Sequence, residues 1–171
     1  DGSTQGGFIY ATSPSGSERG AGESKAGLTP GEGTADIPRH LRAYGSMTYA
    51  GFKSYIYADL DRDDPRVTTA YDWIRRNYTL EENPGIGTDG MYYYFVTFAR
   101  ALDAWGLPYV ETINPDGSAG EARDWANDLI DRLAELQNPD GSFRVIDDRW
   151  MEDNPVLITA YALLALQHAV R

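Results

Sequence analysis

A helix followed by a tight turn occurs twice in this chain, and that duplication limits the folds open to it. Residues 128–143 read as an amphipathic helix to Leu136, then a Gln, the turn Asn-Pro-Asp-Gly-Ser and an aromatic residue. Residues 72–85 repeat much of this pattern 56 residues earlier, with Leu80 aligned to Leu136. In both places a far more apolar helix follows. Such repeats predict a helical array whose units bury their faces on their neighbours.

Composition narrows the classes of partner. The chain has 171 residues, enough for one domain with a core, and a formal net charge of −11. That charge argues against nucleic acid or an anionic membrane, since both require basic patches. The absence of Cys excludes disulfides, thiolate metal ligands and cysteine nucleophiles. The longest apolar run, residues 155–166, is too short for a transmembrane segment.

The first 44 residues differ from the rest. Residues 13–34 are rich in Gly, Ser, Pro and Glu, which predicts an irregular arm. The opening residues, 1–8, resemble the end of another Asp-Gly-Ser-Phe turn, so we expect the arm to include the tail of a preceding repeat. A start at Asp1 instead of Met indicates an excised piece of a longer protein. The compartment stays open, with export to the periplasm or outside favoured over the cytoplasm.

From residue 45 onward, the hydrophobic pattern predicts an all-α domain. Two of the predicted helices carry a single apolar stripe at helical spacing, and the other three are apolar nearly all round. Because the two kinds alternate along the chain, we expect inner helices surrounded by outer ones. The predicted helices span residues 46–58, 65–80, 90–105, 120–137 and 155–169. The expected inner helices are the first, third and fifth, and they should be the more buried set.

Residues 137–143 resemble the glutamine–tryptophan motif of the squalene and hopene cyclases and the protein prenyltransferase β chains. The motif has a Gln, three residues, a Gly, one residue and an aromatic, which here is Phe143. The segment 159–166, Thr-Ala-Tyr-Ala-Leu-Leu-Ala-Leu, also resembles the repeat of that superfamily. The resemblance covers residues 45–171 and implies a partial α/α toroid. We expect Gln137 to bond the turn that follows it, with Phe143 packed close by.

The catalytic machinery of these enzymes is not evident. Residues 61–64, Asp-Arg-Asp-Asp, fit the acidic motif of class II terpene cyclases, but they lead through Pro65 into an outer helix. We therefore expect them to cap that helix in solvent. Without Cys, the zinc site of the prenyltransferases is excluded. His40 and His168 are interpreted as structural or solvated. The sequence thus predicts no catalytic residue, no metal and no cofactor.

Aromatic residues at the starts of the expected inner helices are the candidate binding residues. The resemblance implies that these starts border a central cavity, where rings can contact an apolar or carbohydrate ligand. Core packing is the stronger explanation of the same rings, because a helix that is apolar all round needs such residues to fill the core. The cavity-lining candidates are Thr48, Tyr92, Tyr93, Trp150 and Asn154.

Our leading interpretation is a squalene-cyclase-like domain that acts as a binding or scaffold module. An open inner face would then be covered by missing repeats or by self-association. The alternative is an enzyme fragment, either a class II terpene cyclase-like isomerase or a polysaccharide lyase. A polyuronide lyase would need cations near the cavity, with Arg42, Arg100 and Arg149 as the candidates.

Overall fold

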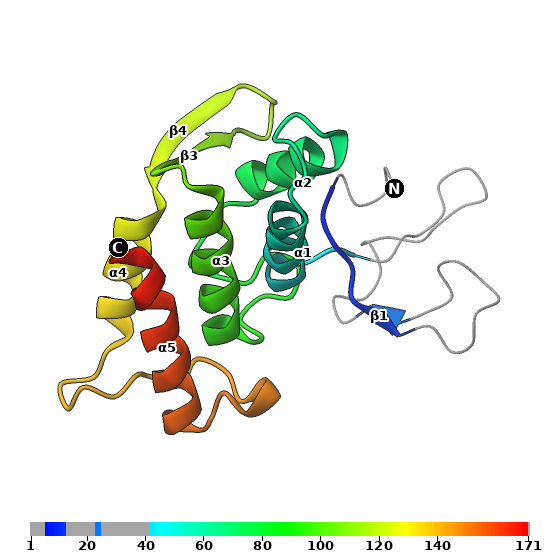
Figure 1. The fold of residues 1–171 in the computed structure, drawn as a ribbon. Helices are drawn as coiled ribbons and strands as arrows, with labels where there is room; N and C mark the ends of the chain where they lie inside the picture. The colour runs from blue at the N-terminus through cyan, green and yellow to red at the C-terminus, as the bar shows by residue number, and fades with distance from the viewer. Residues whose placement is uncertain (1–5, 13–22, 25–41, 171) are drawn as a thin grey trace.

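The computed structural model describes residues 6–12, 23–24 and 42–170. Figure 1 shows its five α-helices packed side by side, with a β-hairpin over one end of the group. The helices are α1 (Gly45–Tyr57), α2 (Pro65–Arg76), α3 (Met91–Trp105), α4 (Trp125–Leu136) and α5 (Pro155–Ala169). The strands are β1 (Ala11–Thr12), β2 (Glu23–Ser24), β3 (Tyr109–Ile113) and β4 (Ala119–Asp124), and one 3-10 helix, η1, spans Arg149–Met151.

Helix α3 is the centre of the fold. It is apolar on every side, and most of its side chains are buried between α1 and α5, which flank it. The Tyr93 ring near the start of α3 contacts the Tyr161 ring of α5, whereas Asp103 near its end contacts His168 at the end of α5. On the other side, Trp105 at the end of α3 packs on Phe52. The three helices α1, α3 and α5 therefore run parallel, with their starts at one end of the molecule.

Helices α2 and α4 lie outside this row. Each buries one apolar stripe and exposes the rest of its surface, as the sequence predicted for the outer helices. Asp64 caps α2 by accepting the Arg66 N–H at 2.9 Å, and Pro65 takes the first position, where a missing N–H costs nothing. Asp124 caps α4 through the Asn127 N–H at 3.2 Å. All five predicted helices exist, but α2 ends at Arg76 and α4 begins only at Trp125.

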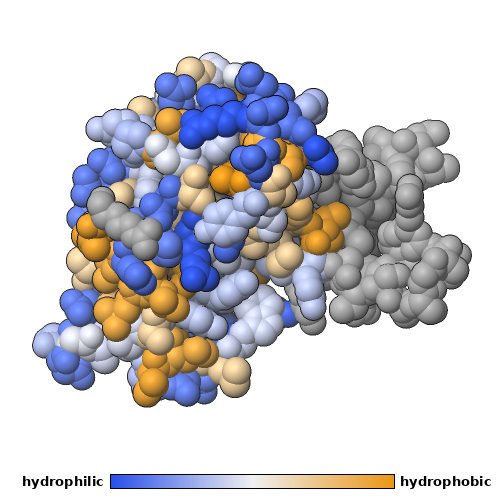
Figure 2. Space-filling model, in the orientation of Figure 1, coloured by the Kyte–Doolittle hydropathy of each residue, from blue (hydrophilic) through white to orange (hydrophobic). Residues whose placement is uncertain are grey.

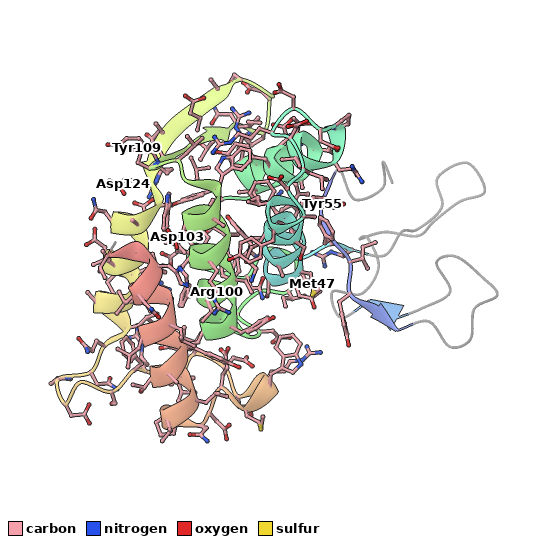
Figure 3. The ribbon with its side chains drawn as sticks, in the orientation of Figure 1. Met47, Tyr55, Arg100, Asp103, Tyr109 and Asp124 are labelled. Carbon is pink, nitrogen blue, oxygen red and sulfur yellow. The ribbon has the colours of Figure 1, made fainter. Side chains whose placement is uncertain are left out.

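The all-α prediction is wrong, because residues 109–124 form an antiparallel hairpin. Strand β3 pairs with β4, and the outermost pair, Tyr109 and Asp124, lies side by side (Figure 3). The β3 sequence, Tyr-Val-Glu-Thr-Ile, is rich in β-branched and aromatic residues, which suit a pleated strand. Residues 120–124, which the sequence predicts as the start of the following helix, belong to β4 instead. The fold is mixed α and β, so a purely helical toroid does not describe it.

The two Asn-Pro-Asp-Gly-Ser segments adopt the same turn. Within each, the Asn N–H donates to the Ser carbonyl, at 2.9 Å for Asn114 and 2.7 Å for Asn138. The Asp carboxylate accepts the Ser N–H and hydroxyl in both. In residues 83–87 the Asn83 N–H donates to the Gly87 carbonyl at 2.7 Å in the same way, so Asn83 matches Asn138, one residue out of the register that the sequence repeat suggested.

The expectation for Gln137 is confirmed. Its side-chain amide donates to the Gly141 carbonyl at 3.3 Å, and Gln137 and Phe143 form a β-bridge with the Phe143 ring buried. Because the Gln137 side chain is exposed, this bond contributes less than a buried one would.

The predicted layering is wrong for α5. Helix α3 is buried almost completely, but α5 is no more buried than α2 or α4, since one of its faces meets solvent. Val156, Leu163 and Leu164 lie on this face and are 76%, 59% and 38% exposed. Figure 2 shows hydrophobic surface gathered at lower left, where α5 lies in Figure 1. No further helix covers this face within the described residues.

Part of the N-terminal arm packs on α1. The Phe8 N–H donates to the Thr48 hydroxyl at 2.9 Å, and the Phe8 ring lies 5.3 Å from the Tyr55 ring. A Cβ on Gly51 would lie 2.4 Å from the Phe8 ring, so glycine is required there for this contact. Strands β1 and β2 form a short antiparallel pair farther along. His40 and residues 1–5 of the expected repeat tail lie outside the described residues.

Candidate functional site

A cavity of about 270 Å³ opens where the starts of α1, α3 and α5 meet. Tyr44 and Ser46 come from the start of α1, Tyr93 from α3, and Tyr161 from α5. Its lining is completed by two residues of the segment between α4 and α5, Trp150 and Glu152. The walls thus combine four aromatic rings with a hydroxyl and a carboxylate.

Glu152 caps helix α3 from a distant part of the chain. Its side chain is only 1% exposed, and its two oxygens accept the N–H groups of Tyr92 at 3.0 Å and Tyr93 at 2.9 Å. The residue before α3 is Gly90, which has no side chain to do this. Burial raises the pKa of the Glu152 carboxyl, and the N–H groups of Tyr93 and Tyr92 offset part of that increase. The cavity therefore has a fixed acceptor in its wall.

The segment that carries Glu152 has an unusual backbone. Trp150 and Met151 have φ angles of 58° and 66°, in the left-handed region that side chains with a Cβ seldom adopt. The Trp150 ring lies so close to Gly90 that a Cβ there would come within 2.6 Å of it. Backbone strain of this kind collects at binding and catalytic sites, where the surrounding structure maintains it.

The guanidinium of Arg149 packs over the Trp150 ring. Its guanidinium carbon lies 4.7 Å from the centre of the Trp150 ring, and its Nη1 forms an ion pair with Asp89. Arg149 therefore fixes the rim of the cavity while its charge is balanced. This anchoring explains how a ring that is 41% exposed keeps a defined position.

The tyrosines supply hydroxyl groups as well as ring faces. The Tyr93 and Tyr161 rings are 6.0 Å apart, centre to centre. Burial, followed by the neighbouring Tyr93 hydroxyl, raises the pKa of Tyr44 to about 12. Burial and the nearby Glu152 carboxylate raise the pKa of Tyr161. At neutral pH these groups keep their protons, so they can donate hydrogen bonds as well as accept them.

Asn83 fixes the α1 side of the cavity. It is completely buried, and its amide oxygen accepts the Ser46 N–H at 3.0 Å. Its amide nitrogen donates to the Ser46 hydroxyl at 2.7 Å and to the Asp89 carbonyl at 3.1 Å. The Asn83 side chain thus bonds both the start of α1 and the loop before α3, and these bonds fix the relative position of the two cavity walls.

Two of the five candidate residues, Tyr93 and Trp150, line this cavity. Tyr92 points into the core instead, where its hydroxyl donates to the Arg144 carbonyl at 2.6 Å. Thr48 is buried and donates to the Tyr44 carbonyl at 2.9 Å. Asn154 caps α5 through the N–H groups of Val156 and Leu157. These three residues shape the helices around the cavity without lining it.

Sequence reasoning missed Glu152, Tyr161, Tyr44 and Ser46 as lining residues. Tyr161 lies within residues 159–166, which resemble the superfamily repeat, so of these four residues it was the one that the sequence could most readily have identified. The role of Glu152 had no local signal, because its hydrogen-bond partners lie about 60 residues away. The nearby Trp150 was predicted to line the cavity, but Glu152 was not.

The acidic segment 61–64 lies at the other end of α3. Arg62 donates to the Trp105 carbonyl at 2.6 Å, and Trp105 is separated from Tyr92 by about 20 Å of helix. Asp61 and Asp63 are exposed, and hydrogen bonds from Arg66 lower the pKa of the Asp64 carboxyl to about 2. The expectation that these residues form a solvent-facing helix connection is confirmed.

A larger cavity, of about 390 Å³, lies between the end of α2 and helix α4. Most of its charged groups are paired with one another. Asp128 accepts from the Tyr78 hydroxyl at 2.7 Å and from Arg123 at 2.9 Å, while Arg132 pairs with Glu81 and Glu135. These contacts join α2 to α4 and the hairpin, which is sufficient to explain them.

In comparisons with known proteins, no family model, curated protein or solved structure matches this chain. Within residues 6–12, 23–24 and 42–170, no cluster of three or more His, Asp or Glu side chains is arranged to hold a metal ion. The helices of that part of the chain are all too short or too polar to cross a membrane.

Proposed function

We propose that this chain is a binding module that takes a small, ring-shaped carbohydrate into the cavity between α1, α3 and α5. The observation that carries the proposal is the composition of the cavity wall, in which Tyr93, Tyr161 and Trp150 surround a fixed carboxylate. Aromatic faces pack on the apolar faces of sugar rings, and hydroxyl and carboxylate groups bond their edges. The volume falls just below the usual range for drug-sized ligands, which suits one monosaccharide ring.

The state of the polar groups favours binding over chemistry. Both oxygens of Glu152 are held by backbone N–H groups, and Arg149 is paired with Asp89. A terpene cyclase would need an acid ready to release its proton, and a polyuronide lyase would need a cation directed at the substrate. Of the arginines considered for a lyase, only Arg149 borders the cavity, beside Trp150. The proposed resemblance to the squalene-cyclase superfamily rests on residues 137–143 and 159–166 alone.

Titration with neutral hexoses tests this function. Glucose, galactose and mannose should be added to the wild-type chain while tryptophan fluorescence is recorded, because Trp150 is far more exposed than the other three Trp residues. We expect at least one hexose to change the emission with a dissociation constant of about 1 mM, the affinity of a ligand of roughly 12 heavy atoms.

Matched variants locate the response. Tyr161→Leu should abolish it, whereas Tyr109→Leu, which removes an exposed ring on the hairpin, should leave it unchanged. A response that survives Tyr161→Leu, or no response to any of the three hexoses, would contradict the proposal.

A second candidate function is self-association through α5, as a scaffold would require. Its support is the exposed apolar face of Val156, Leu163 and Leu164 on a helix without any Asp, Glu, Lys or Arg. Sedimentation of the wild-type chain should then show a dimer that Leu163→Glu converts to a monomer. A wild-type monomer at all concentrations tested would rule this candidate out.

A further inference from the structure

We propose that the ligand of this cavity carries an ammonium group that pairs with Glu152, so that the site selects amino sugars over neutral sugars. This inference rests on the proposed function and specifies its ligand class. It concerns the charge of the ligand, which sugar binding alone does not determine.

The first support is the state of Glu152. Glu152 is 1% exposed and its carboxylate accepts the N–H groups of Tyr92 and Tyr93, with the Met91 N–H also contributing, but no Lys, Arg or His of the described residues forms an ion pair with it. An ionised carboxylate has about four acceptor positions, so some remain unused. A buried charge without a counter-ion is costly, and a cation supplied by the ligand removes that cost.

The second support is the arrangement of rings around this acid. The faces of Trp and Tyr rings attract cations, and cavities that combine several such rings are a known way to bind ammonium groups. Tyr93, Tyr161 and Trp150 line the same cavity as Glu152. Carboxylate and rings therefore favour the same sign of charge.

Three neighbouring positive groups act against a cation, and each is compensated. The start of α3 carries about half a positive charge, which the full negative charge of Glu152 exceeds. The guanidinium of Arg149 is balanced by Asp89. Asn154 occupies free N–H groups at the start of α5. The net field inside the cavity is therefore negative.

Pairs of sugars that differ in one group test the inference. Glucosamine, galactosamine and mannosamine should be compared with their parent hexoses by calorimetry at neutral pH, where the amine is largely protonated and where the raised pKa of Glu152 interferes less than in an acidic buffer. N-acetylglucosamine adds a control in which the nitrogen remains but the charge is lost. We expect an amino sugar to bind the wild-type chain about tenfold more tightly than its parent, a difference of about 1.4 kcal/mol. N-acetylglucosamine should show no such gain.

Two variants assign the preference to Glu152. Glu152→Gln keeps an acceptor for a backbone N–H but removes the charge, so the preference should disappear. Asp153→Asn removes an adjacent exposed charge and should keep it. Equal binding of amino and parent sugars, or a preference that persists in folded Glu152→Gln, would overturn the inference while hexose binding stands. Should Glu152→Gln fail to fold, equal gains for glucosamine and N-acetylglucosamine in the wild type would still overturn it. Absence of binding by every sugar would overturn the proposed function as well.

Discussion

Glu152 and Asp64 are both carboxylates that cap a helix, at opposite ends of α3, yet their surroundings differ. Asp64 lies at the surface and caps α2 by accepting the N–H of Arg66, two residues along the chain. The Arg66 guanidinium is also its ion-pair partner, at 2.7 Å. Glu152 is buried, caps α3 across about 60 residues and has only backbone partners. The comparison teaches that one chemical role has opposite electrostatic consequences, since the pKa is lowered at Asp64 and raised at Glu152.

The largest expected effect comes from removing the buried cap. Glu152→Ala leaves the N–H groups of Tyr92 and Tyr93 buried without partners, which should lower the free energy of unfolding by about 3 kcal/mol. Urea denaturation measures it, with Glu121→Ala as a control for an exposed acid whose side chain is 85% exposed. Equal midpoints for the two variants would show that Glu152 contributes no more than a surface residue.

The strained segment beside Glu152 gives the next effect. Met151→Gly should raise the free energy of unfolding by up to about 1 kcal/mol, because glycine accepts the left-handed backbone without strain. The Met151 side chain is largely exposed and does not line the cavity, so hexose binding should be unchanged. Trp150→Gly relieves the same strain but removes a cavity wall, so it should abolish hexose binding. Retention of binding in Trp150→Gly would place the ligand elsewhere.

The two caps should give pH profiles of opposite slope. The pKa of Glu152 is higher in the folded chain than in the unfolded chain, so the protonated carboxyl stabilises the fold fully at pH values below the unfolded pKa. This contribution to stability is lost as pH rises through the pKa of the folded chain. Relative to Glu152→Gln, the wild type should therefore lose stability as pH rises above about 4. Asp64 contributes above its ordinary pKa, and its contribution is lost as pH falls toward about 2. Denaturation of wild type, Glu152→Gln and Asp64→Asn across this range decides it; parallel profiles would contradict both assignments.

The smallest effect is expected at the exposed cap. Asp64→Asn keeps an oxygen that accepts the Arg66 N–H, and Asn caps helices about as well as Asp. At neutral pH the melting temperature should fall only slightly, because the Asp64–Arg66 ion pair that Asn removes lies at the surface, and hexose binding should stay at the wild-type value. A loss of hexose binding in this variant would connect the two ends of α3 in a way that the contacts do not indicate.

The same contrast explains how far the sequence could be read. Asp64 was recognisable because its signal is local: an acid, then Pro65, then an apolar stripe. The five helices were likewise visible in their hydrophobic periodicity, and the turn at 138–142 was visible in its Asn-Pro-Asp-Gly-Ser sequence. The hairpin was missed because the same Asn-Pro-Asp-Gly-Ser sequence forms both the turn between β3 and β4 and the turn after α4. Only the flanking residues distinguish β3 from a loop. An open face on an inner helix was expected, but its location on α5 was not, because hydrophobic periodicity does not show which helix lacks a neighbour.

At the site, the sequence identified rings at helix starts but not which way they point. Tyr92 and Tyr93 are adjacent in sequence, yet one bonds the Arg144 carbonyl in the core and the other lines the cavity. Which of two neighbours faces the cavity depends on how α3 is rotated between α1 and α5, and that follows from packing throughout the molecule.

The separation along the chain between Glu152 and the helix it caps has a consequence for folding. The cavity is closed only when segments near residues 44, 93 and 152 have come together, and contacts between such distant segments form slowly because long loops must close first. No part of the unfolded chain retains the assembled site, so a bound sugar must shift the whole unfolding equilibrium by RT ln(1 + [L]/Kd). Hydrogen exchange at the first turn of α3 would therefore slow in proportion to occupancy wherever opening of that turn releases the ligand.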